Sequence, residues 1–188
     1  MYAIDQPAIS ALVADPANPS TVWAGTRLPF GGVWRSTDRG VTWQRRGTGL
    51  PAFGDAVTNL YLVPVSPATL YARTGARIYK TTNAGESWSL RATLPSASVR
   101  FTLNPANPSL MFYAQEAAVF RSNDEGSNWT QAGAVPISPG LNGIAGLASS
   151  PVDPARLVAA SNGPTFSGPL ANGIFVSTDS GSSWRRTY

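Results

Sequence analysis

The sequence predicts an all-β protein built from four similar units, and three observations support this prediction. The 188-residue chain contains 18 glycines and 16 prolines and is 43% hydrophobic but only 13% charged, a composition typical of short strands and tight turns around a buried core. No segment carries a sustained helical period of ~3.6 residues. One eight-residue motif recurs along the whole chain, which indicates repeated copies of a single structural unit.

The repeated motif has the form Ser/Thr-x-Asp/Asn-x-Gly-x-x-Trp. Its copies, here called octets, are STDRGVTW at 36–43, TTNAGESW at 81–88, SNDEGSNW at 122–129 and STDSGSSW at 177–184. The glycine is expected to supply the positive φ of a tight hairpin, while the hydroxyl and the carboxylate or amide bond to the turn backbone. The tryptophan brings apolar surface to pack between strands or neighbouring units. The residues assigned this structural role are Ser36, Asp38, Gly40, Trp43, Asn83, Gly85, Trp88, Asp124, Gly126, Trp129, Asp179, Gly181 and Trp184.

Two further stretches repeat in phase with the octets. A pair of prolines three residues apart precedes each one, and because proline cannot donate to a β-ladder these segments are expected to be turns. An aromatic residue also recurs just before each octet, at Trp34, Tyr79, Phe120 and Phe175. Each unit is therefore predicted to contain four strands, A to D, with the prolines in the A–B turn and the octet in the C–D turn.

The spacing of the units predicts β-propeller blades. The third octet positions, 38, 83, 124 and 179, are 45, 41 and 55 residues apart, which is the period of four short strands per blade. We expect a single propeller domain over 1–188, with four four-stranded antiparallel blades at about 7–48, 55–93, 97–133 and 142–188.

The octets resemble Asp-boxes, also called BNR repeats, and the whole unit resembles a blade of the sialidase-like propeller superfamily. That superfamily includes sialidases, sortilin-type receptors, xyloglucanases and a photosystem II assembly factor. The resemblance covers essentially the full chain and implies structural octets that lie away from the functional face. It also implies an extracellular or periplasmic location. The alternative, a calcium ion or catalytic carboxylate at every octet, is disfavoured because Asn83 breaks the set.

Propellers of this type usually have six or more blades, so four blades leave three alternatives. The chain could form a closed four-bladed ring, a half-ring that pairs with a second copy, or a fragment of a larger ring. An uncovered blade face would expose the aromatic column to water. We therefore expect a homodimer of half-rings, with the closed ring as the next choice.

Composition excludes several classes of function. The chain has no histidine and no cysteine, which removes Ser-His and Cys-His nucleophiles and most zinc sites, and no metal or cofactor is expected. The net charge of +4 is spread along the chain, so nucleic acid is not an expected partner. No apolar run approaches the ~20 residues that span a bilayer, so no membrane insertion is expected, and no signal peptide is visible at residues 1–10.

Function is expected at the end of the blades opposite the octets. In an up-and-down blade the A–B and C–D turns share one end, while the B–C and D–A connections share the other. The irregular segments 27–32, 47–56, 131–142 and 161–173 fall at this second end, where loops on a rigid scaffold commonly bind ligands. We expect a non-catalytic module that binds a glycan or a protein ligand. The ligand-binding candidates are Arg27, Phe30, Phe53, Arg77 and Phe166; alternatively, each phenylalanine plugs the end of its own blade.

The competing prediction is a glycoside hydrolase of xyloglucanase or sialidase type, or a fragment of one. Hydrolysis needs two carboxylates about 5–10 Å apart, and Asp55 and Glu116 are the candidates at the loop end. Arg27, Arg77 and Arg100 fall near the same end, but no tyrosine maps beside a glutamate there, as the sialidase resemblance would require.

Overall fold

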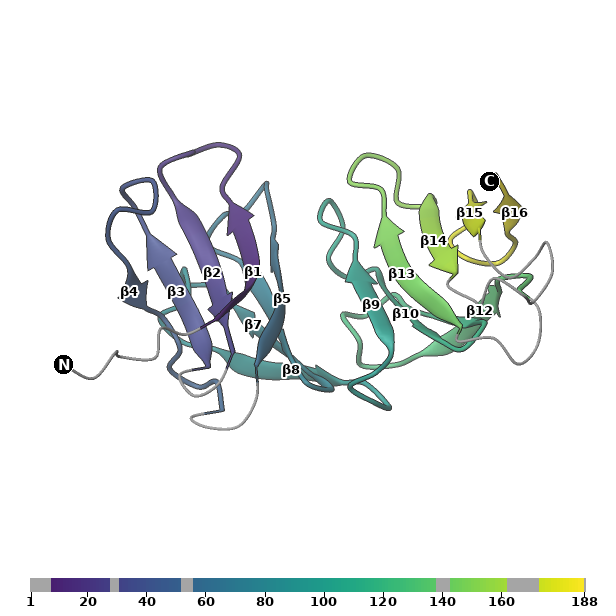
Figure 1. The fold of residues 1–188 in the computed structure, drawn as a ribbon, viewed down its shortest axis with the longest axis horizontal. Helices are drawn as coiled ribbons and strands as arrows, with labels where there is room; N and C mark the ends of the chain where they lie inside the picture. Colours follow the sequence, from purple (N-terminus) through teal and green to yellow (C-terminus); the bar gives the residue numbers. More distant parts are fainter. Residues whose placement is uncertain (1–7, 28–30, 52–55, 138–142, 162–172, 188) are drawn as a thin grey trace. The chain divides into compact units, whose positions relative to one another are not determined.

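The protein is all-β over the part of the chain that the structure describes. The computed structural model describes residues 8–27, 31–51, 56–137, 143–161 and 173–187, and these contain sixteen strands and no helix. The strands form four four-stranded antiparallel sheets, each with its strands in sequence order (Figure 1). The predicted class, a β-propeller built from four four-stranded blades, is confirmed.

The blades are divided between two compact units, unit 1 (Met1–Ala97) and unit 2 (Ser98–Tyr188). Blade 1 contains β1 (Ile9–Ala14), β2 (Val22–Thr26), β3 (Gly32–Ser36) and β4 (Gln44–Arg45). Blade 2 contains β5 (Val57–Leu62), β6 (Leu70–Thr74), β7 (Arg77–Thr81) and β8 (Ser89–Thr93). Blade 3 contains β9 (Arg100–Leu103), β10 (Met111–Gln115), β11 (Ala118–Ser122) and β12 (Thr130–Ala134). Blade 4 contains β13 (Ile144–Ser149), β14 (Leu157–Ser161), β15 (Gly173–Ser177) and β16 (Arg185–Arg186).

The proline turn and the octet of each blade lie at the same end, here called the turn end. In every blade the octet residue before the glycine donates its backbone N–H to the A–B turn, at distances of 2.8–3.1 Å; the bonds are Arg39 to Ser20, Ala84 to Ala68, Glu125 to Ser109 and Ser180 to Ala155. These bonds hold the two hairpins of a blade side by side. The predicted sharing of one end by the A–B turns and the octets is confirmed.

The opposite end, here called the loop end, is joined by its own backbone bonds. The amide of Leu94 donates to Ala76 O at 2.8 Å, and that of Val135 donates to Ala117 O at 2.9 Å, each from the strand leaving a blade to its B–C turn. The B–C turns and D–A connections are therefore neighbours at this end, as expected for an up-and-down blade.

In unit 1 the two blades share a core between their facing sheets. Trp23 and Val33 of blade 1 pack with Leu60, Ala72 and Tyr79 of blade 2. The backbones approach so closely that a Cβ on Gly25 would lie 2.7 Å from Val57 Cγ1, so glycine is required there. The Ser10 hydroxyl adds a 2.6 Å hydrogen bond to Val57 O.

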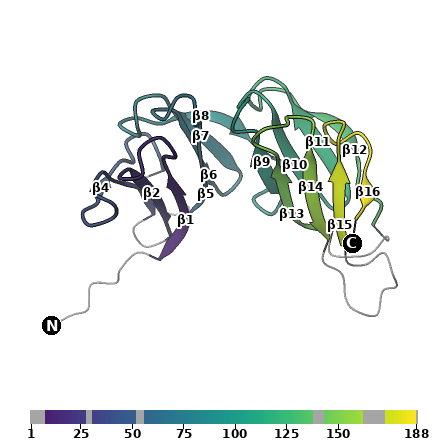
Figure 2. The same ribbon diagram turned by 90° about the horizontal axis from the view of Figure 1, so that it is seen from above.

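Unit 2 repeats this arrangement between blades 3 and 4. Phe112 and Val119 of blade 3 pack with Leu157, Ala159 and Phe175 of blade 4, and all five side chains are fully buried. The first strand of each blade lies next to that of its neighbour in the unit, with β9 beside β13 as β1 lies beside β5 (Figures 1 and 2). In blades 2 and 4 the residues of the aromatic column, Tyr79 and Phe175, therefore lie on the face that packs against the preceding blade of the same unit.

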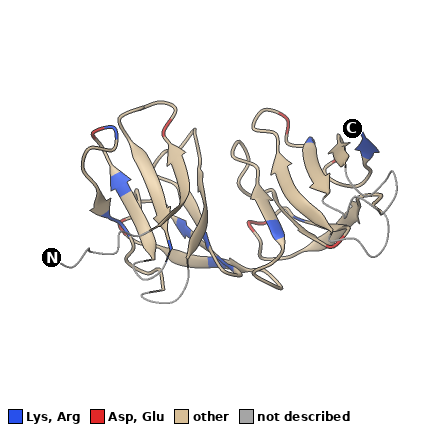
Figure 3. Cartoon of the chain, viewed as in Figure 1, with Lys and Arg blue, Asp and Glu red and all other residues tan. Residues whose placement is uncertain are grey.

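Charged side chains are distributed over both units. Figure 3 shows lysine and arginine on separate strands rather than on one continuous element, and the described acidic residues mostly at turns. No helix in the described part of the chain is long and apolar enough to cross a membrane. The single-domain boundaries and the closure of the ring stay predictions.

Candidate functional site at the loop end of unit 2

The octet aspartates are used by the turns that contain them. In blade 1 the Ser36 hydroxyl donates to Asp38 Oδ1 at 2.7 Å and accepts from the Gly40 amide at 2.8 Å. Asp38 Oδ1 also accepts the Thr42 amide at 2.8 Å, and Oδ2 accepts the Thr42 hydroxyl. Both carboxylate oxygens are thus occupied within the turn, which leaves the group poorly suited to bind a metal or to act as a catalyst.

The same network repeats in the other octets. Asp124 and Asp179 accept the hydroxyl two residues before them and the amide four residues after them, at 2.7–2.9 Å. Asn83 reproduces the pattern through its amide oxygen, which accepts the Thr81 hydroxyl at 2.8 Å and the Ser87 amide at 3.0 Å. An amide can replace the carboxylate here because the turn requires only an acceptor oxygen. Among the described residues no group of three acidic, histidine or cysteine side chains could hold a metal ion.

Hydrogen bonding stabilises the charged form of these carboxylates. The side-chain and backbone donors of Thr42, followed by the Ser36 hydroxyl, lower the pKa of Asp38 from 3.8 to about 2. The pKa of Asp124 falls to about 2 mainly through Asn128, and that of Asp179 to about 2 mainly through Ser183. Carboxylates held this far below neutrality cannot serve as general acids at physiological pH.

The octet tryptophans divide into different roles. The indole N–H of Trp43 donates to Gly40 O at 3.0 Å and that of Trp184 donates to Gly181 O at 3.0 Å, each within its own octet. Trp88 instead reaches the preceding blade, where its N–H donates to Arg46 O at 2.7 Å. Trp129 packs edge-on against Tyr113 with ring centroids 4.8 Å apart. The tryptophans therefore fix turns, strands and blade junctions rather than a ligand.

A pocket of about 400 Å³ opens at the loop end of unit 2. Blade 3 supplies most of it, and blade 4 supplies Ile144 at the start of β13. Its buried lining is apolar and consists of Val99, Ala114 and Ile144, whereas its exposed lining is polar. The polar residues are Ser98, Arg100, Gln115 and Glu116.

Backbone contacts between the blades fix the shape of this pocket. The Ile144 amide donates to Glu116 O at 3.1 Å, and Arg100 Nε donates to Ile144 O at 3.2 Å. Glu116 occupies the B–C turn with a φ of 55°. Gly143 has a φ of 78°, and a Cβ there would lie 3.0 Å from Glu116 Cα and O. Glycine is therefore required where the chain passes the B–C turn of blade 3. The position of Arg100 is therefore set by the junction of the two blades.

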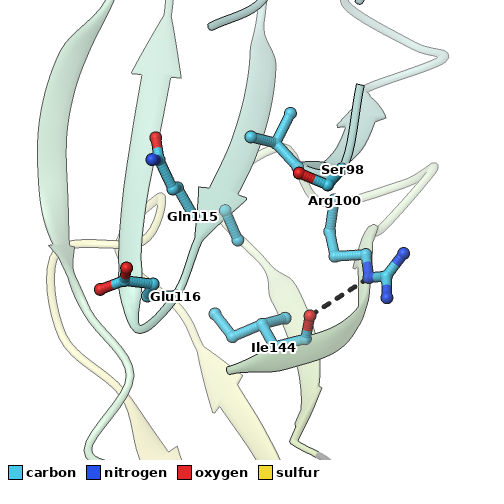
Figure 4. Close-up of a pocket in the computed structure, with 7 residues that line it drawn as sticks. Ser98, Arg100, Gln115, Glu116 and Ile144 are labelled. Atoms are coloured by element: carbon cyan, nitrogen blue, oxygen red, sulfur yellow. Dashed lines mark hydrogen bonds between the residues drawn. The ribbon is translucent and has the colours of Figure 1, made fainter. Parts of the chain in front are cut away.

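The two charged groups of the pocket do not neutralise each other. Figure 4 shows the Glu116 carboxylate and the Arg100 guanidinium on opposite sides of the pocket, pointing away from one another. Arg100 makes one hydrogen bond through Nε, and no hydrogen bond or ion pair joins its Nη atoms to another described residue. A guanidinium in this state can bind a carboxylate or a pair of oxygen acceptors through two parallel N–H bonds.

The structure places the other candidates separately. Arg27 and Arg77 are exposed near the B–C turns of blades 1 and 2, in unit 1, whereas Arg100 and Glu116 belong to unit 2. Phe30, Phe53, Asp55 and Phe166 lie outside the described residues. The Asp55–Glu116 carboxylate pair and the three phenylalanine contacts therefore stay predictions.

Sequence reasoning named Glu116 and Arg100 but did not combine them with Ser98 and Gln115. It assigned binding chiefly to the long irregular segments, while the pocket lies at the short B–C turn of blade 3. The available signal was the pairing of two polar residues, Gln115 and Glu116, at this turn with an arginine at the start of the adjacent strand. Only the register of Arg100 opposite Ala114 brings them together.

Comparison with known proteins supports the blade assignment. The family model for the BNR/Asp-box repeat matches residues 34–45. The match covers the octet of blade 1, which is therefore similar to an Asp-box repeat, as its residues indicated. No curated protein sequence gives a significant match to the chain.

Solved structures are similar to the chain in fold. A GH74 xyloglucanase from Xanthomonas campestris is 19% identical, with a TM-score of 0.70, over 94% of this chain and 29% of that one. YCF48 from Cyanidioschyzon merolae is 14% identical, with a TM-score of 0.67, over 98% of this chain and 57% of that one. A structure of YCF48 bound to D1 peptide is 17% identical, with a TM-score of 0.51, over 96% of this chain and 82% of that one. The chain spans only 24–29% of the length of the GH74 enzymes it matches.

Proposed function

We propose that the protein is a non-catalytic binding module that holds a protein or glycan ligand at the loop end of its blades. The observation that carries the proposal is the contrast between the two ends. At the turn end every octet acceptor is used by its own turn. At the loop end of unit 2 an exposed arginine lines an open pocket with two of its donor atoms available.

The chemistry of the pocket favours an extended polar ligand with an acidic or oxygen-rich group. Arg100 would bind that group, Gln115 would offer an amide donor and acceptor, and the apolar lining of Val99 and Ile144 would contact the ligand body. A peptide segment and a sugar chain both meet this description. The similarity in fold to YCF48, one structure of which contains a bound peptide, supports a peptide as the ligand.

Arg27, Phe30, Phe53, Arg77 and Phe166 belong to the same proposal as further contacts at the loop end. A location outside the cytoplasm also stays a proposal drawn from the resemblance of the octets.

The experiment is a screen of the 188-residue protein against a peptide library and a glycan array, followed by affinity measurements with the best probe. Arg100→Ala is expected to weaken binding by about tenfold or more, because it removes a charge-assisted bidentate contact. Arg156→Ala is the matched control, since Arg156 is also an exposed arginine of unit 2 but lies at the turn end of blade 4. Equal affinities of the two variants, or no probe bound at micromolar concentration, would contradict the proposal.

The second candidate is a glycoside hydrolase that uses Asp55 and Glu116, and the similarity of the fold to GH74 enzymes is the observation that favours it. Incubation with xyloglucan and a sialoside distinguishes the two candidates. Release of sugar that disappears in both Asp55→Asn and Glu116→Gln would establish the hydrolase, whereas binding without turnover would establish the module.

A further inference from the structure

One face of blade 1 and one face of blade 4 carry exposed apolar side chains. Within unit 1, Leu60 of blade 2 lies on the aromatic-column face, packs on blade 1 and is 8% exposed. Leu12 occupies the same register position in blade 1, opposite Ala24 as Leu60 is opposite Ala72, yet Leu12 is 62% exposed. The column face of blade 1, defined by Leu12, Ala24 and Trp34, is thus exposed at Leu12, where the column face of blade 2 is buried.

Blade 4 carries the complementary exposed face. In unit 2, Phe112 and Val119 of blade 3 are fully buried against blade 4. The equivalent positions in blade 4 are Val158, paired with Val176, and Ile174, paired with Ala160. These side chains are 38% and 42% exposed. The forward face of blade 4, defined by Val158 and Ile174, is thus exposed where the forward face of blade 3 is buried.

The two exposed faces are the two halves of an interface that the chain already makes twice. A forward face meets a column face between blades 1 and 2 and again between blades 3 and 4. In both covered junctions the third residue after the octet tryptophan also packs on the octet glycine of the next blade. Cβ atoms built on Gly85 and Gly181 lie 3.0 Å from Arg46 Cβ and 3.5 Å from Ala132 Cβ, respectively.

The residues at the corresponding positions of blade 4 and blade 1 would fit the same contact without burying an unpaired charge. Thr187 of blade 4 is equivalent to Arg46 of blade 1, because its amide donates to Ile174 O as the Arg46 amide donates to Val33 O. Val41 takes the place of Glu86, the partner of Arg46 in a 3.3 Å salt bridge. The charged pair of the covered junction is thus replaced by two uncharged side chains, one of which, Val41, is 80% exposed.

We infer that the forward face of blade 4 binds the column face of blade 1 in a second copy of this chain. Two such contacts, one in each direction, join two copies head to tail and cover these two faces in both copies. A head-to-tail contact that closes gives a ring rather than an open filament. This interface is separate from the pocket at the loop end and does not depend on its ligand.

Light scattering of the protein at micromolar concentration tests the inference, and the expected mass is about twice the 19.8 kDa of one chain. Leu12→Arg and Val158→Arg should each raise the dimer dissociation constant by about tenfold or more, because each buries an unpaired charge at the interface. Both substituted residues are exposed within one chain, so the monomer should stay folded by circular dichroism.

Val65→Arg and Val152→Arg are matched controls, since both valines are more than 80% exposed but lie in A–B turns away from the blade faces. These controls should stay dimeric, and the charge-paired variant Leu12→Glu with Val158→Arg should recover part of the affinity. A monomeric wild-type protein would overturn the inference. So would a dimer that Leu12→Arg and Val158→Arg affect no more than the controls do, or one that only Leu12→Arg disrupts.

Discussion

Substitution of the octet glycine in blade 2 measures how strongly an octet couples two blades. Gly85 has a φ of 78°, and an added Cβ would lie 2.9 Å from Trp23 Cζ3 and 3.0 Å from Arg46 Cβ, both in blade 1. Gly85→Ala therefore combines left-handed backbone strain with overpacking of the blade junction. The strain costs about 1–2 kcal/mol and the overpacking adds about 1–3 kcal/mol to the loss of folding free energy.

Gly40→Ala is the matched control for this experiment. Gly40 has a similar φ of 90°, but its added Cβ would meet only Trp43 Cζ2 of its own octet, at an ordinary 3.6 Å. It should lose only the strain contribution, about 1–2 kcal/mol. Gly181→Ala, with contacts of 3.3 Å to Leu157 and Val119, should fall between the two.

Amide hydrogen exchange of the central strands is the suitable assay, because it reports each unit of the intact chain by itself. Both unit 1 variants are compared in the Leu12→Arg background, so that the inferred dimer contact at Gly40 is absent from both. Equal losses for Gly85→Ala and Gly40→Ala would refute the idea that the octet acts as a blade-to-blade contact.

Two further predictions concern the turn end. The pKa values of Asp38, Asp124 and Asp179 lie at about 2, below the ordinary 3.8, so their contribution to stability is present above about pH 4 and is lost as the pH falls toward 2. Unit 2 holds two of these carboxylates and unit 1 holds one, because Asn83 does not titrate. Amide hydrogen exchange between pH 4 and 2 should therefore show a larger loss of protection in unit 2 than in unit 1. A larger loss in unit 1 would contradict the stabilising role assigned to the octet carboxylates. Asn104→Asp should lower the free energy of unfolding, measured by urea denaturation, by about 1–3 kcal/mol. Asn104 Nδ2 donates to Ser150 O of blade 4 at 2.9 Å, and this donor is lost, while Oδ1 accepts the Ala106 amide of its own turn. The reciprocal change Asp15→Asn keeps the acceptor that binds the Ala17 amide and should be nearly neutral; equal effects would show that the bond across the blades is unimportant.

The octets could be predicted from sequence because their chemistry is local. Ser36, Asp38 and Gly40 contact one another within five residues, so the residue types alone specify the turn. The residue before the glycine was not predicted. Arg39, Ala84, Glu125 and Ser180 all have a positive φ between 54° and 62°, and they share no side-chain property. The backbone imposes this conformation through the hydrogen bond from that residue to the A–B turn.

The blade junctions and the pocket could not be predicted in the same way, because they depend on register between distant segments. Gly85 could be assigned to its turn, but not to its contact with Trp23, which lies 62 residues earlier in the sequence. Likewise Arg100, Gln115 and Ile144 come from three separate strands. Their proximity follows from the antiparallel pairing of β9 with β10 and from the packing of blade 4 on blade 3.

The burial of a blade face could not be predicted from sequence either. Leu12 and Leu60 are the same residue type in the same register, yet only one of them is covered. Sequence alone cannot distinguish them, because burial of a blade face depends on the neighbour and not on the residue. The repeat nevertheless indicates what should cover Leu12, since the chain shows the covered version of that face elsewhere.

Mapping of the bound ligand by backbone amide chemical shifts tests the central claim, that ligands bind at the loop end and not at the octets. The 19.8 kDa chain is titrated with the best probe from the peptide library or the glycan array. We expect the largest shift changes on the pocket amides of Val99, Arg100, Gln115, Glu116 and Ile144, with the octet amides little changed. Shift changes concentrated on the octet residues 122–129 or 177–184, with the pocket amides unaffected, would contradict it.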